Sequence, residues 1–359
     1  MPPIALMTTV LYIGTQDPAG MGIALAQFDS ETGALSQPRL IAPTRDPAFI
    51  TIHPDGFLYV CNTGTPGGVS SFAIERTSGA LTFLNHKPAV GRGPSHIALD
   101  RTGRFVLDAN YGGGYVEIHE RLTDGSLGRQ TAFVQHSGSS VHPQRQTKPY
   151  AHWFGVDPSN RFALAADLGT DRIVIYRFDA ATGALAAHEP PHASVRPGSG
   201  PRHIAWHPNG RFMYAIQELS NEIIAYEWDS SRGTLKEVQT AATLPADFDA
   251  TNTAAEIAVH GSGQFLYASN RGHDSIAVYA LDPSSGRLTL REHVATKGAT
   301  PRHFVFDPTQ RWLIVSNQEG NNLVVFRIDE RAGTLKAHGD PVPLTRPMSL
   351  VFLPAPAGR

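Results

Sequence analysis

The sequence has little of several features that mark particular protein classes. One cysteine, Cys61, in 359 residues excludes an internal disulfide, a zinc finger and a CxxC redox site. The 30 lysines and arginines nearly balance the 32 aspartates and glutamates, which disfavours a nucleic acid or an anionic membrane as a partner. No apolar run approaches the roughly 18 residues that span a bilayer, and Met1–Val10 lacks the basic residues of a signal peptide. We therefore expect a soluble cytoplasmic protein.

Glycine and proline are abundant instead, with 34 and 27 residues spread along the whole chain. Such spacing is typical of many short strands separated by turns. A unit of about 50 residues recurs, in which a short apolar run, a tight turn, two further apolar runs and a glycine hairpin follow one another. The run after the tight turn occurs seven times, at 11–15, 58–62, 106–110, 163–167, 213–217, 266–270 and 313–317.

Four short strands in about 50 residues are typical of a propeller blade, and a sandwich would give no fixed period. The sequence therefore predicts an all-β protein in which residues 1–359 form a single seven-bladed β-propeller domain. The chain begins at the second strand of one blade (11–15) and ends with an isolated first strand (349–353). We expect this C-terminal strand to complete the N-terminal blade and close the ring, which protects the sheet edges.

The repeat also predicts where a site would form. The first two strands of a blade are antiparallel, so the start of the first and the end of the second lie on one face near the axis, where loops converge. At the start of the first strand the seven copies have Ala48, Ser95, His152, Arg202, Ala255, Arg302 and Met348. Just past the second strand they have Gln16, Thr63, Tyr111, Leu168, Glu218, Arg271 and Gln318.

Four charged or titratable residues of these two series come from three consecutive blades, namely His152, Arg202, Glu218 and Arg271. A single arginine on a propeller rim is more often a solvated residue than a ligand. Four such groups on one face favour a catalytic site instead. The candidate substrate-binding residues are Arg302, His203, Tyr111, Gln318 and Glu256.

Two of these candidates have another interpretation. His203 shares its repeat position with His96 and His303, which favours a role within the blade, and Glu256 is a lone acid that suits a supporting position. Two long connections, 129–150 and 241–254, lie on the same face and are candidates for a rim or lid. The first contains four basic or titratable residues, namely His136, His142, Arg145 and Lys148.

Several segments resemble the seven-bladed propeller lactonase family, which includes propeller-type 6-phosphogluconolactonases and muconate lactonizing enzymes. The similar segments are Ala109–Gly114, His142–Gln146, Ala166–Ile173, Ser199–Gly210, Glu218–Glu222 and Ala268–Ser275, and the similarity runs from Leu11 to Pro354. In that family a histidine, two arginines and a glutamate form the proposed site. The resemblance assigns these roles to His152, Arg202, Arg271 and Glu218, and it implies no cofactor and no metal.

The sequence departs from the family pattern in two places. Tyr150 stands where the family has the first histidine of a HisAlaHis motif, and the segment Ala255–Ala258 reads AlaGluIleAla where the family has AlaAspIleHis. Because both places lie beside the expected site, we expect the substrate rim to differ while the core of the site is kept.

Lactone hydrolysis needs a base that deprotonates water and a positive charge beside the oxyanion. Glu218 or His152 can act as the base. Arg202 and Arg271 can stabilise the oxyanion or hold a substrate carboxylate or phosphate. The sequence contains no nucleophile elbow, which argues against a covalent intermediate.

We therefore expect a metal-free lactonase whose partner is an anionic small molecule, in the first place 6-phosphogluconolactone. The partners expected do not include a nucleic acid or a membrane, and the oligomeric state stays open. A lactonizing cycloisomerase on the same site and a non-catalytic binding scaffold are the alternatives. The count of seven blades and the two arginines disfavour a metal-dependent propeller lactonase.

Overall fold

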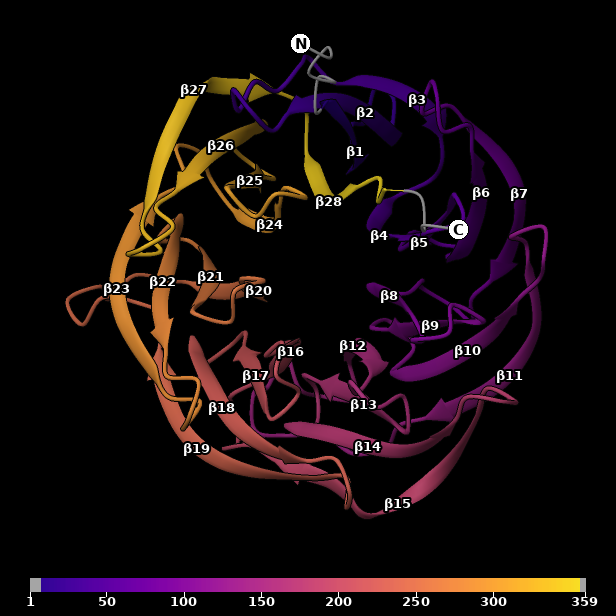
Figure 1. The fold of residues 1–359 in the computed structure, drawn as a ribbon. Coiled ribbons are helices and arrows are strands. Elements are labelled where there is room, and N and C mark those ends of the chain that lie inside the picture. The colour runs from indigo at the N-terminus through magenta and orange to yellow at the C-terminus, as the bar shows by residue number, and fades with distance from the viewer. Residues whose placement is uncertain (1–7, 356–359) are drawn as a thin grey trace.

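The computed structural model describes residues 8–355, which form 28 β-strands. The strands make seven four-stranded antiparallel sheets that stand around a central axis (Figure 1). Within residues 8–355 there is no helix long and apolar enough to cross a membrane. This architecture confirms the predicted all-β, seven-bladed propeller.

Each sheet is one blade. From the axis outward, the first blade contains β28 (Pro347–Phe352), β1 (Thr8–Thr15), β2 (Gly22–Asp29) and β3 (Arg39–Pro43), and the second contains β4 (Pro47–His53), β5 (Phe57–Asn62), β6 (Gly68–Ile74) and β7 (Leu81–Pro88). The third contains β8 (His96–Leu99), β9 (Phe105–Asn110), β10 (Tyr115–Arg121) and β11 (Leu127–Gln135), and the fourth contains β12 (Ala151–Val156), β13 (Phe162–Asp167), β14 (Arg172–Asp179) and β15 (Ala184–Ser194). The last three contain β16 (Pro201–Trp206), β17 (Phe212–Gln217), β18 (Glu222–Asp229) and β19 (Thr234–Ala242); β20 (Thr253–Val259), β21 (Phe265–Arg271), β22 (Ser275–Leu281) and β23 (Leu288–Ala295); and β24 (Pro301–Phe306), β25 (Trp312–Asn317), β26 (Asn322–Ile328) and β27 (Leu335–Pro343).

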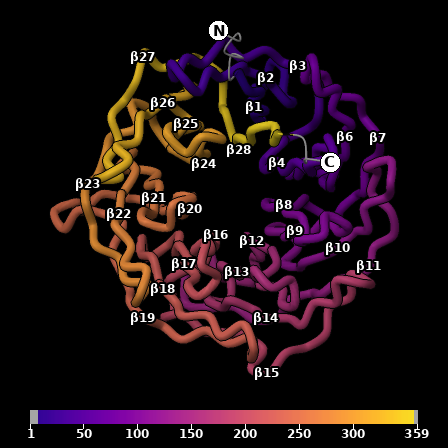
Figure 2. Tube along the Cα trace, in the orientation of Figure 1, coloured from indigo at the N-terminus to yellow at the C-terminus, as the bar shows by residue number. Residues whose placement is uncertain are grey.

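The ring closes as the sequence predicts, because β28 pairs with β1. Leu11 lies opposite Phe352, and Ile13 lies opposite Leu350. Figure 2 traces the chain around the ring until its yellow end meets its indigo beginning. The strands themselves begin earlier than expected, since β1 starts at Thr8 and β28 at Pro347. The innermost strand of the N-terminal blade is thus supplied by the C-terminal part of the sequence.

The second strand of each blade lies in the hydrophobic core. Strands β9, β13, β17 and β25 are buried along their whole length, because both faces of the blade pack on neighbouring blades. Apolar side chains therefore occupy successive positions instead of alternating with polar ones. Leu11 and Ile13 of β1, for example, share one apolar cluster with Trp312 and Ile314 of β25.

A tyrosine in the second strand joins one blade to the next. The Tyr12 hydroxyl donates a hydrogen bond to the Gly79 carbonyl at 3.0 Å, and Tyr59 makes the same bond to Gly125 at 2.9 Å. Two further blade pairs repeat this contact, through Tyr214 with Gly286 and Tyr267 with Gly333. The φ angles of the four glycines, Gly79, Gly125, Gly286 and Gly333, lie between 71° and 84°. Glycine adopts this conformation without strain. The tyrosine of the second apolar run and the glycine of the hairpin thus form one contact between neighbouring blades.

Candidate active site

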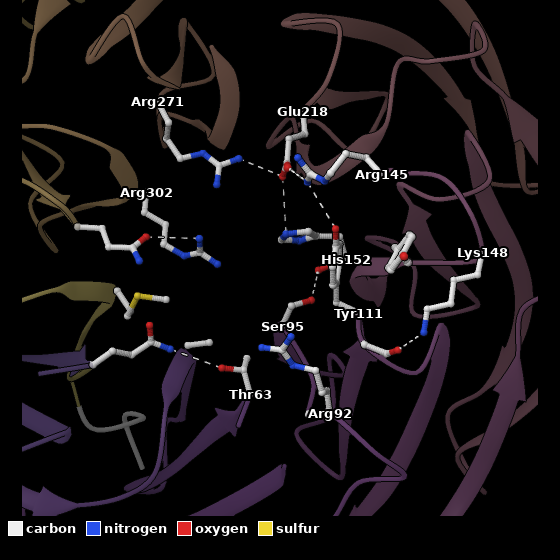
Figure 3. A pocket seen from close by; sticks show the side chains of 17 residues that line it. Thr63, Arg92, Ser95, Tyr111, Arg145, Lys148, His152, Glu218, Arg271 and Arg302 are labelled. Atoms are coloured by element: carbon white, nitrogen blue, oxygen red, sulfur yellow. Dashed lines mark hydrogen bonds and ion pairs between the residues drawn. The ribbon is translucent and has the colours of Figure 1, made fainter. Parts of the chain in front are cut away.

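A cavity of about 520 Å³ opens at the face where the first strands begin and the second strands end. Seventeen residues line it (Figure 3). Eleven of them belong to the two series that the repeat isolates, namely Gln16, Ala48, Thr63, Ser95, Tyr111, His152, Glu218, Arg271, Arg302, Gln318 and Met348. The predicted face is thus the face that carries the cavity.

A local irregularity of the first strand sets the direction of the side chains at its start. The pairing of β12 with β13 shifts register between Ala151 and Trp153, so that His152 forms a bulge. The same shift occurs at Arg202, between Pro201 and His203, and at Arg302, between Pro301 and His303. A bulge turns its extra residue away from the regular alternation of the strand. These three side chains therefore lie near the mouth of the ring instead of inside a blade.

The Glu218 carboxylate is the centre of an ion cluster. Arg202 Nε donates to Oε2 at 3.0 Å, and Arg271 Nη2 lies 3.0 Å from the same oxygen. Arg145 Nη2 donates to Oε1, and His152 Nε2 lies 3.9 Å from Oε2. Figure 3 shows Arg271, Arg145 and His152 turned toward Glu218. The structure thus brings together the four residues predicted as catalytic and adds Arg145.

The cluster fixes the charge of Glu218. Burial alone would raise the pKa of this carboxyl, but Arg271, Arg202 and Arg145 outweigh burial and lower the pKa from 4.5 to about 2. The side chain is 4% exposed, so the guanidiniums act on it with little screening by water. Glu218 is therefore ionised at neutral pH, and its carboxylate is a weak base.

His152 is neutral for a related reason. Burial lowers the pKa of its imidazole well below 6.5, and the charge of Arg202 lowers it further. Nδ1 has no hydrogen-bond partner among residues 8–355. Tyr111 meets the ring edge to face, with the two centroids 5.4 Å apart. The His152 ring thus lines the cavity beside a carboxylate, with Nδ1 buried and without a partner in the described part of the chain.

Arg202 has a different place from the other cations. Its side chain is 2% exposed, its Nη1 donates to the Ala255 carbonyl at 2.6 Å, and it is absent from the wall of the main cavity. Burial lowers its pKa to about 9, with Arg271 adding to the effect. It is still protonated at neutral pH. Arg202 therefore lies behind Glu218, while Arg271 and Arg302 line the cavity.

The family described as "Lactonase, 7-bladed beta-propeller" matches residues 10–352. The chain belongs to this lactonase family. A relative named 6-phosphogluconolactonase from Bacillus subtilis is 38% identical to this lactonase over 346 residues, which cover 95% of this chain and 97% of the relative.

Two solved structures are also similar to this lactonase. A putative 6-phosphogluconolactonase from Bacteroides fragilis superposes with a TM-score of 0.91 at 29% identity, over 98% of this chain and 99% of that one. The periplasmic gluconolactonase of Pseudomonas aeruginosa superposes with the same TM-score at 31% identity, over 97% and 100%.

The remaining candidate residues of the lactonase divide into two groups. Arg302, Tyr111 and Gln318 line the cavity, and Arg302 Nη1 donates to Gln318 Oε1 at 3.5 Å. His203 and Glu256 lie in a smaller space that Arg202 also lines. There His203 Nδ1 is 3.1 Å from Glu256 Oε2, so the two residues pair with each other. Contact of either residue with a substrate stays a prediction.

Three cationic side chains of the cavity wall were not among the predicted site residues. Arg92, Arg145 and Lys148 come from connections between blades. The connection 129–150 was a candidate rim, and it supplies Arg145 and Lys148, whereas 241–254 supplies none of the 17 lining residues. Gln146 anchors this rim, since its side chain is fully buried and donates to the Leu168 carbonyl at 2.9 Å.

The cavity wall is strongly cationic and offers few metal ligands. Among the residues described, five basic side chains line it, Arg92, Arg145, Lys148, Arg271 and Arg302, against the single carboxylate of Glu218. Since that carboxylate already contacts three guanidiniums, it is poorly placed to bind a cation. The arrangement suits an anionic ligand instead.

Proposed function

We propose that this lactonase hydrolyses an anionic sugar lactone, 6-phosphogluconolactone, to 6-phosphogluconate. The excess of basic side chains around the cavity carries this proposal. Guanidinium and ammonium groups bind phosphate oxygens through charge-assisted hydrogen bonds. The relative named 6-phosphogluconolactonase, with 38% identity over nearly the whole chain, adds support.

The base in this proposal is His152. Glu218 is a weak base, because three guanidiniums hold its pKa at about 2. The neutral imidazole can take a proton from a water molecule that attacks the lactone carbonyl. The Glu218 carboxylate, 3.9 Å from Nε2, then stabilises the imidazolium that forms. An anionic substrate would further favour that protonated state.

Arg271 and Arg302 supply the positive charge for the oxyanion, because both line the cavity. The oxyanion role expected for Arg202 passes to Arg302 in this scheme, and Arg202 becomes a positioning residue for Glu218. A covalent route has little support. Ser95 lines the cavity, but its hydroxyl donates to the carbonyls of His152 and Ala109 and not to an imidazole. The collapsing intermediate expels the ring oxygen, which takes its proton from the His152 imidazolium.

The test compares hydrolysis of 6-phosphogluconolactone and gluconolactone by variants that copy sister blades. His152→Ser, which copies Ser95, should lower kcat about 10²–10⁴-fold for both lactones. Arg302→Ala, which copies Ala48, should lower kcat about 10²–10³-fold. The cavity-lining control Gln16→Thr, which copies Thr63, should change little. A His152→Ser variant that folds and keeps the parental rate would refute the assigned base.

The phosphate contact has its own readout. Lys148 and Arg92 extend the basic wall beyond Arg271 and Arg302. Lys148→Gln and Arg92→Gln should raise KM for the phosphorylated lactone and leave gluconolactone nearly unaffected. Equal effects on both lactones would mean that these cations do not bind the phosphate.

The same basic wall also fits a substrate with several carboxylates, which keeps the lactonizing cycloisomerase as a second candidate. That enzyme would form a lactone from a muconate carboxylate, and a histidine would donate the proton. Turnover of a carboxymuconate without hydrolysis of either sugar lactone would favour this candidate over the first.

A further inference from the structure

The interior of the third blade, β8–β11, contains three buried ionisable side chains. Asp108 belongs to β9, and Glu117 and His119 belong to β10. Their exposed fractions are 0%, 6% and 5%. One ligand atom from each lies within 4.8 Å of the ligand atoms of the other two. None of the three lines the active-site cavity.

The other six blades show what these positions normally hold. Asp108 lies opposite Glu117 in the pairing of β9 with β10, and His119 lies opposite Val106. The positions equivalent to Asp108 hold Ile13, Val60, Ala165, Ala215, Ala268 and Val315. Those equivalent to Glu117 hold Ala24, Ser70, Val174, Ile224, Ala277 and Val324. Those equivalent to His119 hold Ala26, Phe72, Tyr176, Tyr226, Tyr279 and Phe326.

A blade therefore needs no charge at these positions to fold. Seventeen of the eighteen equivalents are apolar or aromatic, and the exception, Ser70, has hydrogen bonds to Asn62 and His86. Three adjacent replacements by acid, acid and imidazole in one blade require a reason outside ordinary packing.

The three side chains lack the partners that buried charges need. Both carboxylate oxygens of Asp108 and both ring nitrogens of His119 have no hydrogen-bond partner among residues 8–355. Glu117 accepts a hydrogen bond from Gln130 Nε2, and its only ion-pair partner in that part of the chain is His119, at 3.6 Å. Two carboxylates thus oppose each other across neighbouring strands. Even a protonated His119 would leave one of them uncompensated.

We propose that Asp108, Glu117 and His119 bind a first-row divalent cation, such as Zn²⁺ or Mn²⁺, inside this blade. Two carboxylates and one imidazole form a ligand set that such cations accept. A charge of +2 balances both carboxylates, and coordination gives a partner to the Asp108 carboxylate and to one of the two unpartnered ring nitrogens of His119. The cation would stabilise the fold, since its ligands lie outside the catalytic cavity.

The charge environment agrees with this geometry. Burial, and then the charge of Glu117, raise the pKa of Asp108 well above its ordinary value. Burial also raises the pKa of the neighbouring Cys61 thiol, to which the charges of Asp108 and Glu117 add. Without a cation, this interior therefore disfavours the charged form of Asp108. The competing arrangement is a proton held between Asp108 and Glu117.

The experiment measures metal in the untagged full-length protein. The protein is produced in minimal medium supplemented with Zn²⁺ or with Mn²⁺, passed through metal-free gel filtration and analysed by mass spectrometry of the elements. We expect roughly one equivalent of one of these metals per chain. Because the site is buried, the metal should stay bound during brief treatment with a chelator.

The matched control variant carries, at these three positions, the residues found at the equivalent positions of the blade β24–β27. Asp108→Val, Glu117→Val and His119→Phe together install the residues of Val315, Val324 and Phe326. This triple variant should keep the cooperative melting of the parent and lose the bound metal. If it does not fold, Asp108→Ala, which copies Ala165, removes one carboxylate and leaves Glu117 paired with His119. Its metal content should fall at least tenfold.

Melting supplies the second readout. The parent grown with its preferred metal should melt at a higher temperature than the parent grown without added metal, because the cation binds the folded state. The triple variant should melt at one temperature in both media. The proposal is overturned if the parent carries no more metal than the variants and melts alike in all media, since Asp108 and Glu117 would then share a proton.

Discussion

Replacing Glu218 by glutamine tests whether the ion cluster holds the active-site mouth together. Gln16 and Gln318 already occupy the same repeat position, so the side chain fits and the main change is loss of charge. The variant leaves the buried Arg202 and the partly exposed Arg271 without the carboxylate that each contacts at 3.0 Å. We therefore expect Glu218→Gln to lower the stability of the protein.

The magnitude follows from the pKa of Glu218. The cluster lowers that pKa from 4.5 to about 2, and one pKa unit corresponds to about 1.4 kcal/mol, so the charge is favoured by about 3 kcal/mol. Removing one partner of a buried ion pair typically costs about 3–5 kcal/mol. Both estimates predict that Glu218→Gln lowers the free energy of unfolding by about 3 kcal/mol.

The assay is a double-mutant cycle followed by thermal and urea unfolding. Arg271→Gln removes one guanidinium, and the same two sister residues show that glutamine is tolerated there. The double variant loses one charge of each sign, so it should be less destabilised than the sum of the single variants, by about 1–3 kcal/mol. Strict additivity, or a Glu218→Gln variant as stable as the parent, would refute the cluster as a source of stability.

Three further outcomes follow from the structure. The folded pKa of Glu218 lies below its ordinary value, so its stabilisation is present above about pH 4.5 and is lost as the pH falls toward 2; acid unfolding monitored by circular dichroism should show this loss in the parent and not in Glu218→Gln. Ending the chain before Arg346 removes β28, the partner of β1, so the product should be insoluble or melt far lower, and unchanged melting would contradict ring closure. Brief chelation, which should leave a buried ion in place, should not change lactone hydrolysis, because Glu218 is engaged by guanidiniums; a loss of activity with unchanged melting, which added metal restores, would contradict the metal-free mechanism.

The repeat explains how much of this site the sequence predicts. Each blade serves as a control for the others, so residues such as His152 and Arg271 stand out at positions where most sister blades have uncharged residues. The fold itself follows from the same repetition, and the pairing of β28 with β1 follows from where the repeat starts and stops. These inferences depend on regular strands, where position in sequence fixes position in space.

What the sequence does not predict lies where the repetition fails. Arg145 and Lys148 belong to a long connection with no sister copy, so the sequence places them in a candidate rim but does not distinguish them from its other polar residues. Arg202 has the expected position, but its burial behind Glu218 depends on the direction of a side chain at a bulge. Nothing in the repeat pattern marks Asp108, because it occurs inside a run that is otherwise mostly apolar. Cytoplasmic location and the lack of nucleic-acid or membrane partners stay predictions.

The most direct test of the account is the rate at which the purified protein opens 6-phosphogluconolactone, measured beside gluconolactone at a pH where spontaneous opening is slow. We expect hydrolysis of both lactones, with a higher kcat/KM for the phosphorylated one, and we expect His152→Ser to reduce both rates toward the spontaneous rate. If 6-phosphogluconolactone opens at the same rate with and without the protein, the proposed function is contradicted.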